Sequence, residues 1–176
     1  FSESNFWKSL TLRFFSTIFP NLKVSGKGII NVRASNNNEM LEKLSKDIFF
    51  IHKPSLESLE GITNLMDDSF KDALNYLISP TYKTMILVPI IDEIVPRKPL
   101  IEILKNKKVT KNISKKIDIG VYENSFHMML RDVEGSKITN HIRMWIENDN
   151  SIKNNKAFID SFKRLNGNQY YHRLEK

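Results

Sequence analysis

Cysteine is absent from this sequence. The chain therefore has no disulfide framework and offers no thiolate ligand for a structural zinc ion. Proteins of reducing compartments commonly lack disulfides, so we expect a cytoplasmic location.

Several other signals are missing as well. No apolar run approaches the ~20 residues that a transmembrane helix needs, and no signal peptide is visible. The four histidines are scattered without ligand spacing, so we expect no metal site. Gly26 and Gly28 form a close pair, but the residues that complete a phosphate-binding loop do not follow them. We therefore expect no cofactor.

The composition that is present is ordinary for a globular domain, with 40% hydrophobic and 27% charged residues. The formal net charge of +7 favours anionic surfaces such as phospholipid headgroups. Residues 105–116 include six lysines but no aromatic residue. Because sites for single-stranded nucleic acid stack bases on aromatic side chains, this run predicts a solvated loop.

Apolar residues recur at helical spacing in much of the chain. Pro20 ends the first of these segments, and the third lies between Pro54 and Pro80. Asparagines precede the second helical segment and predict an N-cap for it. The predicted helices are residues 6–19, 39–46, 55–79, 132–148 and 157–165.

Two short apolar runs, residues 85–91 and 117–122, have the length and the β-branched composition of buried strands. Residues 99–107, between them, have the spacing of a helix. A strand, a helix and a second strand within about 40 residues form a βαβ unit, in which the strands pair in parallel. The fold class predicted from this pattern is α/β.

Two chemically important residues follow the predicted strands. Asp92 comes directly after the first strand, and His127 lies a few residues after the second. Because functional groups of open parallel sheets collect at the carboxyl ends of the strands, we expect these side chains within hydrogen-bond reach. A carboxylate that orients an imidazole supplies two members of a nucleophilic triad.

The two loops are similar to those of a known family. Three features together resemble the C-terminal part of an α/β-hydrolase. They are the run Asp-Glu-Ile-Val-Pro from Asp92, the run Tyr-Glu-Asn-Ser-Phe-His up to His127, and a helix ending near Trp145. The most similar group is the monoacylglycerol lipase and lysophospholipase-like one (serine aminopeptidase S33, Hydrolase-4). The resemblance implies that Asp92 is the triad acid and His127 the triad base. One departure is the absence, just before Asp92, of the glycine that the family usually has there.

The resemblance also implies a domain organisation. Residues 1–80 would form a helical cap or lid region, residues 81–150 the C-terminal segment of the hydrolase core, and residues 151–176 a tail. The fold would thus contain the last parallel strands and helices of an α/β-hydrolase, preceded by its cap. As a cap element, helix 6–19 is expected to leave aromatic side chains exposed.

The family's nucleophile elbow, Gly-x-Ser-x-Gly, is missing, because none of the glycines upstream of Asp92 brackets a serine in this pattern. The chain begins at Phe1. We therefore interpret it as the C-terminal portion of a serine ester hydrolase that lacks its nucleophile and is inactive alone.

The partners that this interpretation implies are a lipid ester substrate (a monoacylglycerol or a lysophospholipid) in the complete enzyme and an N-terminal half that carries Gly-x-Ser-x-Gly. A peripheral contact with a membrane is also implied, whereas nucleic acid is not expected. The alternative interpretation is a non-enzymatic basic module that binds an anionic membrane or nucleic acid. An upstream reading frame with a nucleophile elbow distinguishes the two.

Overall fold

The computed structural model describes residues 3–25, 32–113 and 115–147, and the side chains from residue 10 onward within these ranges. Contacts divide the chain into two compact units. The first comprises Phe1–Asn31 and Ser45–Ala73, and the second comprises Val32–Leu44 and Leu74–Lys176. The predicted domain boundaries at residues 80 and 150 stay predictions. The predicted tail and helix 157–165 lie outside the described residues.

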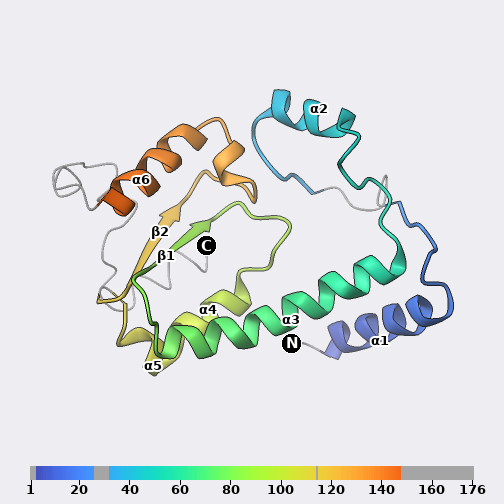
Figure 1. Ribbon diagram of the computed structural model, residues 1–176, viewed down its shortest axis with the longest axis horizontal. Coiled ribbons are helices and arrows are strands. Elements are labelled where there is room, and N and C mark those ends of the chain that lie inside the picture. The colour runs from blue at the N-terminus through green and yellow to red at the C-terminus, as the bar shows by residue number, and fades with distance from the viewer. Residues whose placement is uncertain (1–2, 26–31, 114, 148–176) are drawn as a thin grey trace. The chain divides into compact units, whose positions relative to one another are not determined.

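The first unit contains α1 (Glu3–Ile18) and the larger part of α3 (Leu56–Ile78) (Figure 1). Glu60 of α3 accepts a hydrogen bond from the Ser16 hydroxyl and lies 3.8 Å from Arg13. The backbone amide of Leu56 donates to the Leu22 carbonyl at 3.0 Å. These contacts join α3 to α1 and to the chain segment that follows α1.

Large apolar side chains of this unit remain in contact with solvent. Phe14, Phe15 and Phe19 are all exposed, which confirms the prediction of exposed aromatic residues on the first helix. The turn after α2 (Asn38–Lys46) exposes four consecutive apolar residues, from Ile48 to Ile51. None of the described helices is long and apolar enough to cross a membrane.

The second unit is built on two strands, β1 (Thr84–Pro89) and β2 (Ile117–Tyr122). They pair in parallel, with Thr84 opposite Ile117 and Pro89 opposite Tyr122, so the predicted parallel pairing is confirmed. Between them the chain forms α4 (Lys98–Lys105) and α5 (Lys107–Thr110), and after them η1 (Met129–Arg131) and α6 (Gly135–Glu147).

Helices lie on both sides of this small sheet (Figure 1). On the α6 side, Tyr122, Met129 and Ile138 form a buried cluster. The Trp145 indole on α6 donates to Asp118 of β2 at 2.8 Å. On the side of α4 and α5, Leu104 and Val109 are fully buried. The core of this unit therefore encloses β2, whose two faces are both covered.

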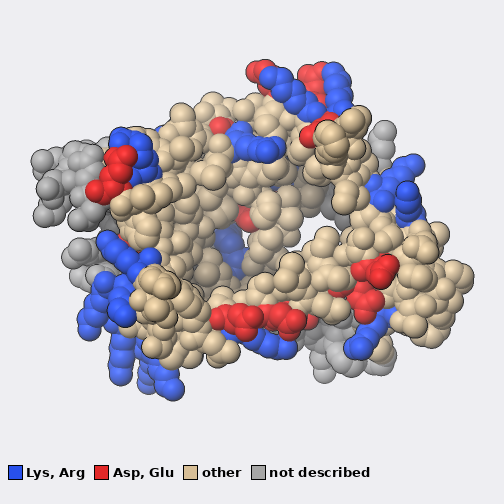
Figure 2. Space-filling model, viewed as in Figure 1, with Lys and Arg blue, Asp and Glu red and all other residues tan. Residues whose placement is uncertain are grey.

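The lysine-rich segment differs from the predicted loop, because it contains the short helix α5. The Asn106 side chain caps this helix by accepting a hydrogen bond from the Lys108 amide at 2.9 Å, and Val109 anchors it in the core. The prediction was wrong because the many lysines of this run indicate a solvated loop, whereas Asn106 and Val109 stabilise a helical turn within it. The lysine side chains themselves are exposed, and cationic groups gather over α4 and α5 (Figure 2).

Candidate functional site

The candidate acid lies in a turn directly after β1. Asp92 is separated from Pro89, the last residue of the strand, by Ile90 and Ile91. One of its carboxylate oxygens, Oδ1, accepts hydrogen bonds from the amides of Ile94 and Val95, at 2.8 and 2.9 Å. An aspartate that accepts hydrogen bonds from amides two and three residues ahead stabilises its own turn. These bonds position the carboxylate without a glycine just before it.

The candidate base lies in the loop between β2 and η1. Ser125 and Phe126, which precede His127, are both buried. The loop is joined to the acid loop through the backbone, because the Ile91 amide donates to the Ser125 carbonyl at 2.9 Å. Parallel strand pairing thus brings both loops to one edge of the sheet, as the sequence predicts.

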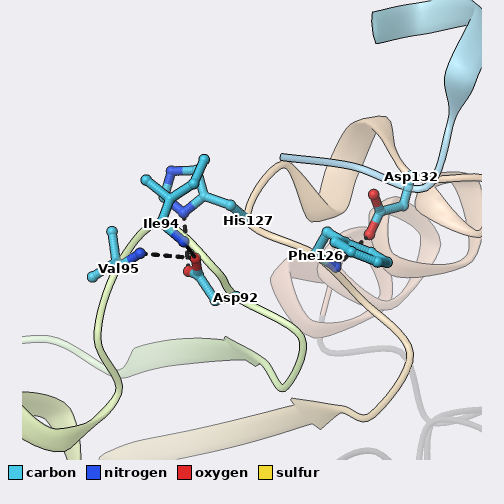
Figure 3. A network of polar contacts seen from close by, with 6 residues as sticks. All are labelled: Asp92, Ile94, Val95, Phe126, His127 and Asp132. Atoms are coloured by element: carbon cyan, nitrogen blue, oxygen red, sulfur yellow. Dashed lines mark hydrogen bonds and ion pairs between the residues drawn. The ribbon is translucent and has the colours of Figure 1, made fainter. Parts of the chain in front are cut away.

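Asp92 and His127 meet there in a hydrogen-bonded pair (Figure 3). Nδ1 of His127 lies 2.9 Å from Oδ2 of Asp92, which confirms the predicted proximity of the two side chains. The carboxylate side chain is only 9% exposed, whereas the imidazole is 39% exposed. Within the described part of the chain, Nε2 of His127 has no hydrogen-bond partner. This nitrogen therefore has the position that a proton acceptor needs.

The surroundings of Asp92 favour its ionised form. Burial is the largest single influence and acts to raise the pKa of this carboxyl. The hydrogen bonds from His127, Val95 and Ile94, together with the charge of His127, outweigh burial and lower the pKa below its usual value. An ionised Asp92 that accepts a hydrogen bond from Nδ1–H fixes the tautomer in which Nε2 carries no proton.

A second carboxylate, which no sequence pattern predicted, is hydrogen-bonded to the histidine loop (Figure 3). Asp132 is buried, and its Oδ2 accepts a hydrogen bond from the Phe126 amide at 2.8 Å. Its Oδ1 accepts from the Ser35 hydroxyl at 2.6 Å. The sequence signal for this contact is weak, because Ser35 and Asp132 are 97 positions apart.

The other described histidines have other neighbours. His52 is exposed, and its ring lies 3.3 Å from the Asp47 carbonyl oxygen. His141 is buried on α6, where its Nδ1 is 2.9 Å from the Tyr122 hydroxyl. His172 lies outside the described residues. Nowhere in the described ranges do three His, Asp or Glu side chains gather as a metal site requires.

No protein-family model matches the sequence, and no curated protein matches it. A solved structure does match: the crystal structure of a monoacylglycerol lipase from Paleococcus ferrophilus, at 18% sequence identity and a TM-score of 0.62. The match covers 81% of this chain and 52% of the lipase, so the chain spans about half the length of the protein it resembles. Over these residues the chain shares the fold of part of an α/β-hydrolase.

Proposed function

We propose that this chain is the C-terminal portion of a serine ester hydrolase of the S33 (Hydrolase-4) group, acting on monoacylglycerols or lysophospholipids. The observation that carries the proposal is the hydrogen bond between His127 and Asp92 at the carboxyl edge of two parallel strands. The similarity to a monoacylglycerol lipase fold supports the same class of substrate. Asp92 is the orienting acid and His127 the base.

The reaction follows from the geometry of the pair. Nε2 of His127 takes the proton of a serine hydroxyl, and the serine oxygen attacks the ester carbonyl carbon. The tetrahedral intermediate collapses as His127 gives that proton to the leaving glycerol or glycerophosphate alcohol. Water then cleaves the acyl-enzyme through the same base. Asp92 stabilises the imidazolium in each step, and no cofactor is needed.

The partner in this proposal is an N-terminal half that carries the serine in a Gly-x-Ser-x-Gly elbow. The outer edge of β1 supports such a partner. The amides of Thr84 and Ile90 donate toward the β2 side, to Lys116 and Tyr122, at 2.8 and 3.0 Å. Because peptide groups alternate in direction along a strand, those of Met85 and Leu87 face the other side. No described strand pairs with that side. Parallel sheets usually have more strands and are covered on both faces, so β1 offers an edge for further strands.

The test of this function is the coding region upstream of Phe1. The segment it encodes is expressed together with the 176-residue chain and treated with a serine-directed fluorophosphonate probe. We expect a frame with a strand, Gly-x-Ser-x-Gly and a helix, and labelling of its serine in the assembled protein. His127→Ala should abolish turnover, and Asp92→Asn should lower it by about 10⁴-fold because the wrong tautomer is favoured. His52→Ala, a change of an exposed histidine in the other unit, is the control and should retain full activity.

An upstream region without such an elbow contradicts the proposal. An assembled, labelled enzyme in which His127→Ala keeps full turnover contradicts the assignment of the base.

We further propose a peripheral membrane contact on the cytoplasmic side, made by the turn 48–51. Ile48 and Phe49 are both 88% exposed, and Ile51 is 71% exposed. The turn is ordered by Asp47, whose side chain accepts a hydrogen bond from the Phe49 amide at 2.8 Å. The sequence places Lys46 and Lys53 on its two flanks, and both are exposed. Apolar side chains flanked by lysines are typical of segments that enter the interface of an anionic bilayer.

Vesicle sedimentation tests this contact. The chain should sediment with vesicles that contain phosphatidylserine and less with neutral phosphatidylcholine vesicles. Phe49→Ser should reduce binding, whereas Ile146→Ser, which replaces an exposed apolar residue on α6, should not. Equal binding by both variants excludes the turn as the contact.

A further inference from the structure

We propose that Asp132, together with Ser35, is a positioning residue that sets the orientation of His127. The inference rests on the proposed function only in taking His127 as the base. Neither Asp132 nor Ser35 touches the reacting atoms. Both act through the backbone of the loop that carries the histidine.

The carboxylate of Asp132 is a buried acceptor for three donors. Its Oδ2 accepts from the Phe126 amide at 2.8 Å. Its Oδ1 accepts from the Ser35 hydroxyl at 2.6 Å and from the Asn36 amide at 3.2 Å. Asp132 is 5% exposed and Ser35 is fully buried, so water does not readily replace these bonds. The contact therefore joins the segment around Ser35 to the loop that carries the candidate base.

The segment 34–36 holds the histidine loop from the other side as well. The amide of Met128, the residue after His127, donates to the Ala34 carbonyl at 2.8 Å. The amide of Val133 donates to the Asn36 side chain at 2.8 Å. Phe126, the residue before His127, is thus fixed by Asp132, and Met128, the residue after it, is fixed by Ala34. With both neighbours held, the direction of the His127 side chain is restricted.

The same segment also reaches the acid loop. The Arg33 amide donates to Glu93, the residue after Asp92, at 2.8 Å. The Arg33 guanidinium donates to the Ser35 carbonyl at 3.0 Å and lies 5.3 Å from the centre of the Phe126 ring. Residues 33–36 therefore contact both loops of the candidate site. Because a hydrogen-bonded pair at 2.9 Å tolerates little displacement, fixing both loops preserves its geometry.

Asp132→Asn is the variant that tests the positioning contact, because asparagine has one acceptor oxygen where aspartate has two. If that oxygen accepts from Ser35 and Asn36, the amide nitrogen opposes the N–H of Phe126. If it accepts from Phe126, the amide nitrogen faces Ser35 and Asn36, and the Asn36 amide loses its acceptor. Asp132→Asn thus disrupts the positioning contact in either orientation with little change of volume. Ser35→Ala is milder, because it removes one hydroxyl and leaves both carboxylate oxygens.

The experiment measures the tautomer of His127 in the full 176-residue chain by long-range ¹H–¹⁵N NMR of the imidazole at neutral to slightly alkaline pH. The wild-type ring should carry its proton on Nδ1, bonded to Asp92. In Asp132→Asn we expect the ratio of this tautomer to its alternative to fall by roughly tenfold. Ser35→Ala should give a smaller change in the same direction.

Asp118→Asn is the matched control. Asp118 is a partly buried carboxylate that accepts a hydrogen bond from Trp145, but it lies near the opposite end of β2. Asp118→Asn should lower the stability of the fold and leave the His127 tautomer unchanged. This result separates an effect on positioning from a general loss of stability. An unchanged tautomer in folded Asp132→Asn overturns the inference, and if that variant does not fold, an unchanged tautomer in Ser35→Ala overturns it.

Failure of the inference and failure of the proposed function give different results. A changed tautomer together with an inactive assembled enzyme leaves the inference standing and removes the hydrolase proposal. If the assembled enzyme is active and Asp132→Asn keeps the wild-type turnover and the wild-type tautomer, the inference is overturned and the hydrolase proposal stands.

Discussion

At the scale of single residues, Asp92 combines burial with three hydrogen bonds from its surroundings. Two come from amides of its own turn and one from His127. These bonds lower its pKa although burial, the largest influence, acts in the opposite direction. The folded chain therefore stabilises the ionised form of Asp92 relative to the unfolded chain. This difference links the candidate site to the stability of the protein.

The first prediction concerns acid unfolding. Because the folded pKa of Asp92 lies below its unfolded value of about 3.9, its contribution is fully present above that pH and is lost as pH falls through the folded pKa. Asp92→Asn should therefore be less stable than the wild type at neutral pH, and the difference should shrink below a pH of about 4. Urea unfolding midpoints across this range measure it. A difference that stays constant at every pH contradicts the assignment.

The second prediction concerns His141. Burial, and secondarily the charge of Lys137, lower its pKa from 6.5, so the folded state favours the neutral ring. Burial also raises the pKa of the Tyr122 phenol, which keeps its proton beside Nδ1 of His141. The stability contributed by the neutral ring is present above the unfolded pKa and is lost as pH falls below it. Stability should decline as pH is lowered from about 7 to about 5.

His141→Asn is the informative variant, because asparagine offers Tyr122 an acceptor without titrating in this range. It should lower stability at neutral pH and flatten the decline toward pH of about 5. An equally steep decline in the variant, measured by thermal unfolding, assigns the pH dependence to other groups.

Asp92 and His127 could be predicted from the sequence because each follows an apolar run that is recognisable as a strand. Parallel pairing then determines that they meet. Asp132 and Ser35 could not be predicted in this way. Their contact spans 97 positions and depends on how the loop around residue 35 packs behind η1, which no local pattern encodes. Their catalytic or positioning roles stay predictions.

At the scale of helices and strands, two glycines illustrate opposite roles. Gly61 lies within α3, and a Cβ atom added there would meet nothing within 4 Å. Gly135 begins α6, and a Cβ atom there would lie 2.3 Å from the Leu130 carbonyl oxygen. Such a distance is not compatible with a real side chain, and the obstacle is backbone. Glycine is therefore required for the close approach of α6 to η1.

The third prediction compares these positions. Gly61→Ala should stabilise the protein by up to ~1 kcal/mol, because alanine favours the helix and space is open. Gly135→Ala should destabilise it by about 1–3 kcal/mol, because the backbone at Leu130 must shift. Thermal unfolding of both variants gives opposite signs if the packing is as described. Equal shifts in the melting temperature would show that α6 does not pack closely on η1.

The boundaries of the other elements follow from local signals to different degrees. The long helix between Pro54 and Pro80 was predicted closely, since prolines mark both ends. Strand β2 was predicted at its exact bounds. The turn α5 was missed because its cap, Asn106, and its anchor, Val109, are surrounded by lysines. Charge patterns report solvation of side chains and carry little information about a single helical turn.

At the scale of the whole molecule, the fold class could be predicted because one βαβ unit already determines parallel pairing. The sequence also revealed the missing nucleophile elbow. In the described part of the chain no further strand pairs with the outer edge of β1. The final prediction follows from the proposed combination of an acid and a base without a nucleophile elbow.

Purified alone, this chain should not hydrolyse a p-nitrophenyl ester or a monoacylglycerol above background, and a fluorophosphonate probe should leave it unlabelled. The reason is that no serine occupies a nucleophile elbow, and hydrolysis without nucleophile and oxyanion hole retains little rate. Ser125, although close to His127 in sequence, is buried. If the isolated chain is active, loss of activity in Ser125→Ala but not in Ser136→Ala, an exposed serine on α6, would identify Ser125 as the nucleophile and refute the interpretation of an incomplete hydrolase.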